Sequence, residues 1–125
     1  MTSRINHVVL NEIHVSLEDA TIDGVCATPL ELVVWLRTWN AVSIRLRVQD
    51  PIEFAYRPSG DLSFVEVASP SDPRGAESSS CFPGWSEIND AYSDVDLIRL
   101  VGSDDRLIAF AIAPRGSGPI FETCT

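Results

Sequence analysis

Apolar and polar residues alternate along much of the chain, and this alternation predicts β-strands. Between residues 5 and 17, Ile13, Val15 and Leu17 alternate with polar neighbours, which is the period-two pattern of a half-buried strand. A short apolar continuation at 22–26 follows a turn at 18–21. We therefore expect the first part of the chain to be extended, with one long strand as its main element.

The next segment carries the signals of a helix. Thr28 is a favourable N-cap residue, Pro29 suits the first helical position, and Glu31 completes a capping box. Four apolar residues follow at the i, i+3, i+4, i+7 spacing of one helix face. We predict a helix over residues 29–39 that is either buried on two sides or uses its outer face in an interface. The four apolar residues are Leu32, Trp35, Leu36 and Trp39.

Two further alternating stretches, 42–48 and 52–56, are separated by Gln49-Asp50-Pro51. Pairing Val48 with Ile52 places the apolar residues of both stretches on one face and the polar residues on the other. We therefore predict an antiparallel hairpin. The same register sets Arg47 opposite Glu53.

A third strand is predicted to follow this hairpin. The turn residues at 58–61 lead into 62–67, where Val65 and Val67 are placed on the core face.

The last third of the chain is predicted to be a hairpin of central strands. Residues 94–101 and 106–113 flank a turn at 102–105, and both stretches are apolar on two faces. We expect Ile98 and Leu100 to share a face with Leu107 and Ala109, and Leu97 and Val101 to share the other with Ile108 and Phe110. The tail, 114–125, is predicted to add an edge strand at Ile120 and Phe121.

This order of elements predicts an α+β fold. We expect a single-layer, mainly antiparallel sheet of about five to seven strands packed against one long helix at residues 29–39. Residues 1–125 are predicted to form a single domain, because this length is common for one domain. A long loop rich in Ser, Pro and Gly interrupts the pattern at 69–86, and its aromatic residues Phe82 and Trp85 suggest that its second half is anchored.

The charge balance restricts the partners that the chain can have. It contains no lysine, and nine arginines face eighteen Asp and Glu residues, for a formal net charge of −9. Such a surface repels nucleic acid and anionic membranes, so neither is expected as a partner. The missing lysine reflects either a GC-rich genome or selection for the planar guanidinium, and one sequence cannot separate these.

No apolar stretch approaches the roughly 18 residues of a membrane-spanning helix, and no signal peptide pattern is present, so we expect a cytoplasmic protein.

No group of residues has the spacing of an active site or a metal centre. His7 and His14 are seven residues apart, which would place them on opposite faces of one strand. Asp90, Asp94 and Asp96 lack the glycine and glutamate of a calcium loop. We therefore expect no catalytic residues, no metal and no cofactor. The three cysteines, Cys26, Cys81 and Cys124, are expected to be free thiols, with a Cys26–Cys124 or Cys81–Cys124 disulfide as the alternative.

Three functions remain open. The first is an acidic, protein-binding inhibitor of the kind that bacteria use as immunity proteins against basic toxins. The second is a small-molecule binder or small enzyme with a pocket between helix and sheet, lined by Trp35, Trp39, Phe54 and Tyr56. The third is a subunit or adaptor of a larger assembly, which would include self-association. For the first function we expect a binding surface formed by Glu87, Asp90, Asp94, Asp96, Phe82 and Trp85, where the acidic excess adjoins the long loop.

Overall fold

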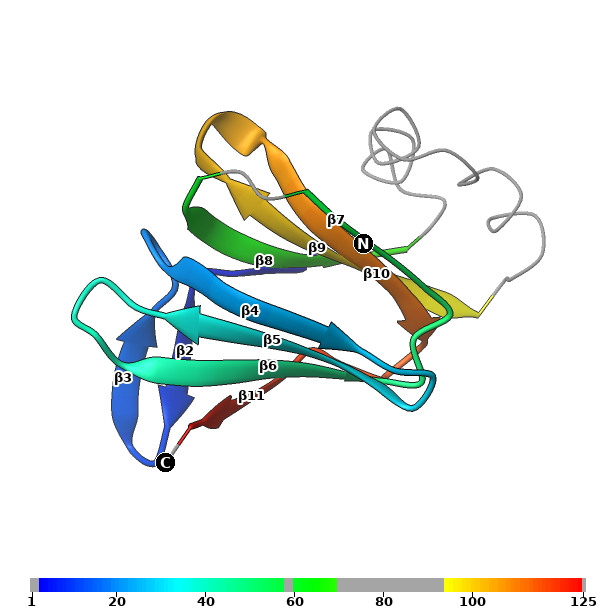
Figure 1. Ribbon diagram of the computed structural model, residues 1–125, viewed down its shortest axis with the longest axis horizontal. Helices are drawn as coiled ribbons and strands as arrows, with labels where there is room; N and C mark the ends of the chain where they lie inside the picture. Colours follow the sequence, from blue (N-terminus) through cyan, green and yellow to red (C-terminus); the bar gives the residue numbers. More distant parts are fainter. Residues whose placement is uncertain (1–2, 58–59, 70–93, 125) are drawn as a thin grey trace.

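The alternating stretches fold into two antiparallel sheets that face each other as the layers of a β-sandwich (Figure 1). The computed structural model describes residues 3–57, 60–69 and 94–124. The five-stranded sheet has the order β1 (Ser3–Ile5), β8 (Leu62–Ala68), β9 (Val95–Gly102), β10 (Leu107–Pro114) and β7 (Glu53–Tyr56). The four-stranded sheet has the order β11 (Ile120–Thr123), β6 (Ser43–Gln49), β5 (Glu31–Arg37) and β4 (Thr21–Ala27). A separate hairpin consists of β2 (His7–Leu10) and β3 (Ile13–Ser16), and a short 3-10 turn, η1 (Ser103–Asp105), joins β9 to β10.

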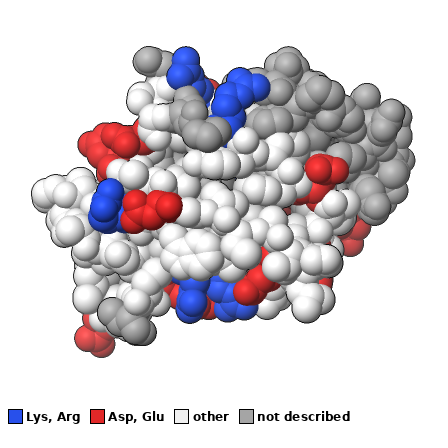
Figure 2. All heavy atoms as spheres, in the orientation of Figure 1, with Lys and Arg blue, Asp and Glu red and all other residues white. Residues whose placement is uncertain are grey.

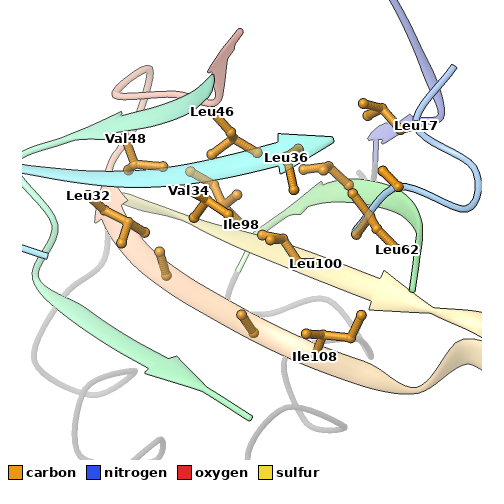
Figure 3. Packing of buried hydrophobic residues seen from close by; sticks show 14 of the residues in the cluster. Leu17, Leu32, Val34, Leu36, Leu46, Val48, Leu62, Ile98, Leu100 and Ile108 are labelled. Carbon is orange, nitrogen blue, oxygen red and sulfur yellow. The ribbon is translucent and has the colours of Figure 1, made fainter. Parts of the chain in front are cut away.

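The core lies between the two sheets. Every second residue of β5 and β6 points inward and is buried, and these side chains meet the inward side chains of β8, β9 and β10 (Figure 3). Side chains from the two inner faces interdigitate in this way in aligned sandwiches. The central members are Leu32, Val34, Leu36, Leu46, Val48, Val65, Ile98, Leu100 and Ile108.

The predicted α+β fold is wrong, because residues 29–39 form no helix and the described part of the chain contains no α-helix. Residues Glu31–Arg37 are strand β5, hydrogen-bonded between β4 and β6. Along this strand Leu32, Val34 and Leu36 point to the same side and are buried in the core. The β-branched pair Val33-Val34 also suits a pleated strand better than a helix.

The capping signal at Thr28 serves a hairpin turn. Thr28 Oγ1 accepts hydrogen bonds from the backbone N–H groups of Leu30 (3.3 Å) and Glu31 (3.1 Å), as it would at a helix N-terminus. The backbone N–H of Thr28, however, donates to the carbonyl oxygen of Glu31 at 2.9 Å, which closes a turn between β4 and β5. A threonine makes the same local bonds in both settings, so the sequence motif could not distinguish them.

The strand partners predicted for 42–48 and 52–56 are also wrong. β6 pairs with β5 and β11, whereas β7 pairs with β10 in the other sheet. The chain therefore crosses between the sheets near Pro51 instead of turning back on itself. The predicted faces are correct for β6, whose Ile44, Leu46 and Val48 are all buried.

Residues 5–17 form a hairpin instead of one strand. β2 and β3 are antiparallel and are joined by Asn11 and Glu12, which have φ values of 52° and 67°. Two consecutive residues with positive φ are the signature of the tight type I′ turn, whose twist matches that of the flanking strands.

The C-terminal predictions are largely confirmed. β9 and β10 are antiparallel neighbours buried on both faces, and β11 is an edge strand. Val65 lies in the core and Val67 packs against it, as predicted. A register shift between Leu107 and Ala109 exchanges two residues, so that Ile108 joins the inter-sheet core and Leu107 joins the cluster on the other face. A bulge of one residue reverses the faces in this manner. Apart from Ser69, the predicted loop at 69–86 lies outside the described residues.

Candidate functional site

The candidate site is the outer face of the four-stranded sheet, the face that points away from the core. The register places two rows of residues across this face, one centred on Trp35 and one on Arg47. Because side chains alternate along each strand, the members of one row lie side by side. The first row is Gly24, Trp35, Arg45 and Glu122, and the second is Cys26, Val33, Arg47 and Ile120.

Trp35 is the large apolar residue of this face. It is 37% exposed, although Val33 on the same strand is buried. A Cβ atom built on Gly24 would lie 3.6 Å from Trp35 Cε3, so the ring lies against β4 where that strand has no side chain. Trp35 is therefore held in place on one side and open to solvent on the other.

Two arginines and two glutamates form an ion-pair network beside Trp35. Arg47 donates through Nη2 to Glu31 Oε2 at 2.7 Å and through Nη1 to Glu122 Oε1 at 2.6 Å. Arg45 donates through Nη2 to the other oxygen of Glu122. Figure 2 shows basic and acidic side chains adjacent at the lower edge of the molecule, where β6 and β11 lie in Figure 1. The four charges cancel, so the face is polar but locally neutral.

The network shifts the pKa of two of its members. The hydrogen bond to Glu31, followed by that to Glu122, raises the pKa of Arg47. The hydrogen bonds from Arg47 and then Arg45 lower the pKa of Glu122 below the usual range of a glutamate. Glu122 therefore remains ionised in mildly acidic solution and links the edge strand β11 to β6.

This arrangement predicts a pH dependence of the β11 edge. Because the pKa of Glu122 is lower in the folded chain than in the unfolded one, its contribution to stability is complete above about pH 4.3, the pKa of an unfolded-chain glutamate, and is lost as the pH falls through the lower folded value. Glu122→Gln should remove this dependence and lower the protection of the β11 amides at neutral pH. Hydrogen exchange at Ile120 and Cys124 measures this protection, because the Cys124 N–H donates to the Ser43 carbonyl oxygen and the alternation of antiparallel bonds turns the Ile120 N–H toward β6 as well. Equal protection in both proteins at neutral pH would contradict the prediction.

A shallow groove of about 460 Å³ adjoins this face. It combines an indole, two guanidinium groups, a carboxylate, a hydroxyl and a thiol. Its lining residues are Cys26, Thr28, Glu31, Val33, Trp35, Arg45 and Arg47.

The structure describes only part of the partner surface that was predicted from the sequence. Glu87, Asp90, Phe82 and Trp85 lie outside the described residues. Asp94 forms an exposed ion pair with Arg115 at 3.3 Å, and Asp96 Oδ2 accepts a hydrogen bond from the backbone N–H of Gly116 at 3.1 Å. Both carboxylates thus connect the start of β9 to the turn that follows β10.

The predicted pocket between helix and sheet does not form, because a strand takes the place of the helix. Its residues are dispersed: Trp35 lies on an outer face, whereas Phe54 packs against the inter-sheet core. Trp39, in the turn after β5, is 71% exposed, and Tyr56 lies on the edge strand β7.

The structure brings together residues that the sequence did not connect. Arg45 and Arg47 were expected on an outer face, but their glutamates come from β5 and β11, which only the strand order reveals. His7 Nε2 and His14 Nδ1 lie 2.9 Å apart, because the β2–β3 hairpin places them diagonally across two strands, contrary to the expected separation.

Cys26 and Cys124 are free and exposed, so the alternative of a disulfide between them is wrong.

Comparison with known proteins identifies no relative: no family model, curated protein or solved structure matches the chain. Among the described residues, no group of three or more His, Cys, Asp or Glu side chains is placed to hold a metal ion. The same part of the chain contains no helix with the length and apolar character needed to cross a bilayer.

Proposed function

We propose that this protein is a small acidic protein-binding module, and that it acts as an inhibitor or immunity-type protein by covering a basic protein partner such as a toxin. The observation that carries the proposal is the exposed Trp35 flanked by Arg45 and Arg47 on the outer face of β11-β6-β5-β4. Tryptophan and arginine are the residues most enriched among those that dominate binding energy at protein interfaces.

The charges support a basic partner. The net charge of −9 attracts a cationic protein over a distance of about 10 Å at moderate salt and accelerates its approach. On the outer face itself, the partly exposed Glu31 uses only Oε2 in its bonds to Arg47, and a carboxylate can accept further hydrogen bonds from a partner's arginines. A cytoplasmic location belongs to the same proposal, since an immunity protein meets its toxin inside the cell that makes both.

The rigidity of the outer face also favours recognition. Trp35 is supported by the backbone at Gly24, and the arginines are fixed by ion pairs to two strands. Side chains already ordered in the free protein lose little conformational freedom on binding, and this improves affinity. The face sits on strands and not on loops, which keeps its geometry constant.

The test compares two exposed tryptophans in binding to a purified partner. The protein encoded beside the gene for this chain, or a basic protein captured by this chain and then purified, is titrated by calorimetry. Trp35→Ala should weaken the complex at least tenfold, since a central interface tryptophan contributes roughly 2 kcal/mol or more. Trp39→Ala is the matched control, because Trp39 is more exposed but lies in the turn after β5. The affinity should also fall as salt rises.

Two results would contradict the proposal. Equal weakening by Trp35→Ala and Trp39→Ala would indicate general adhesion of exposed aromatic rings. Unchanged affinity of the Trp35→Ala variant would show that the partner binds to another surface of the protein.

An adaptor or subunit role is the second candidate, and the edge strand β4 favours it. Within the described residues β4 pairs only with β5, so one side of a seven-residue strand is available to a further strand. Strand addition at such an edge is a common mode of recognition. Light scattering that gives a stable dimer, together with loss of the dimer in a β4 edge variant such as Asp23→Pro, would favour this role over the inhibitor.

A further inference from the structure

The β2–β3 hairpin places the only two histidines of the chain in direct contact. The two rings are stacked with centroids 5.0 Å apart and an angle of 23° between their planes. His7 Nε2 and His14 Nδ1 are 2.9 Å apart, at hydrogen-bonding distance. Both residues are exposed, so the pair is open to solutes.

This geometry follows from the register of the hairpin. His7 is opposite Ser16, and His14 is opposite Val9, so the two histidines are diagonal neighbours on one face. Diagonal neighbours across an antiparallel pair are within reach of long or aromatic side chains. The tight turn at Asn11 and Glu12 fixes this register, since both residues adopt positive φ.

We propose that His7 and His14 form a two-histidine chelate for a divalent transition-metal ion with a square or octahedral coordination preference, of the Cu²⁺ or Ni²⁺ class. Imidazole nitrogens bind such ions at about 2.0–2.1 Å, and two adjacent corners of a square or octahedron at that bond length are about 2.9 Å apart. A tetrahedral site would need the two nitrogens about 3.3 Å apart at the same bond length. The observed 2.9 Å equals the N···N separation of the first geometry, and rotation of the two exposed rings would turn both lone pairs toward one ion.

Metal binding leaves the number of protons on the histidine pair unchanged. In the metal-free pair one ring donates an N–H to the lone pair of the other. On binding, that ring transfers its proton from the coordinating nitrogen to its second nitrogen through solvent, so both imidazoles remain neutral and the metal accepts two lone pairs. The remaining coordination positions are filled by water or by a ligand from another molecule, because no third His, Cys, Asp or Glu of the described residues joins the group.

The site is independent of the proposed function. It lies on the β2–β3 hairpin, a separate two-stranded sheet, whereas Trp35 and its arginines lie on the four-stranded sheet. Either proposal can therefore fail while the other stands.

The experiment titrates the full chain with Ni²⁺ and uses a background in which Cys26, Cys81 and Cys124 are serine, so that thiols do not compete. The parent should bind one Ni²⁺, and His7→Gln and His14→Gln should each weaken binding by about 100-fold, because the second ligand of a chelate acts at a high effective concentration. In nuclear magnetic resonance the ring signals of both histidines should broaden together. Melting curves without metal should coincide for all three proteins, since both rings are exposed.

Single variants that each retain the affinity of the parent would show two independent histidines and overturn the chelate. Binding that persists in the His7→Gln/His14→Gln double variant would place the metal elsewhere and overturn it as well. Tighter binding of Zn²⁺ than of Ni²⁺ would contradict the square or octahedral geometry, since Zn²⁺ prefers a tetrahedral site.

Discussion

Glu66→Ala is expected to lower the free energy of unfolding by about 3–5 kcal/mol, because it removes the carboxylate that forms an ion pair with the buried guanidinium of Arg99. Arg99 Nη1 donates to Glu66 Oε1 at 2.8 Å, and each side chain is only 1% exposed. The two residues are directly opposite on β8 and β9, at the centre of the five-stranded sheet. A buried guanidinium cannot recover the lost interaction from water, so the loss is far larger than at the surface. Urea unfolding measures it.

The matched control is an exposed ion pair of the same charge type. Arg37 and Asp23 are 3.5 Å apart with side chains 53% and 41% exposed, and Asp23→Ala should cost at most about 1 kcal/mol. Replacing both members of the buried pair, as Glu66→Leu with Arg99→Met, should recover most of the stability, since apolar side chains of similar volume need no partner. A loss of about 1 kcal/mol or less for Glu66→Ala would show that the pair is hydrated after all.

Leu36→Ala is expected to cost about 2–5 kcal/mol, because it removes buried methyl groups and leaves a cavity between the sheets. Leu36 is 1% exposed and packs in the inter-sheet core. Trp39→Ala should change the free energy of unfolding by no more than about 0.5 kcal/mol, since Trp39 is 71% exposed.

Comparing Leu36→Ala with Trp39→Ala also tests whether this segment is a strand or a helix. On a helix over 29–39, Leu36 and Trp39 would share the buried face, and truncation of the tryptophan would cost about 3–5 kcal/mol. A large loss for Trp39→Ala in chemical denaturation would therefore contradict the assignment of β5. Leu30→Ala is a second control, because Leu30 is 77% exposed in the turn before β5.

The candidate site was only partly predictable. Alternation in 42–48 placed Arg45 and Arg47 on an outer face, and the structure confirms that position. The register predicted from the sequence set Arg47 opposite Glu53, whereas Glu31 and Glu122 neutralise the two arginines. Glu122 is 75 residues from Arg47 in the sequence, and no local pattern connects them.

The sequence by itself determined the buried side of β6, the core position of Val65 on β8, the β9–β10 hairpin, the edge strand at Ile120–Phe121 and the strong negative charge. These features are local, because alternation reports the burial of a face and a short turn connects neighbours. Only the tertiary structure decided that 31–37 is a strand, which strands are hydrogen-bonded, and that His7 meets His14. Backbone hydrogen bonds are the same for any neighbouring strand, and a threonine oxygen caps a helix or a turn with the same bonds, so the choice depends on the packing of the two sheets against each other.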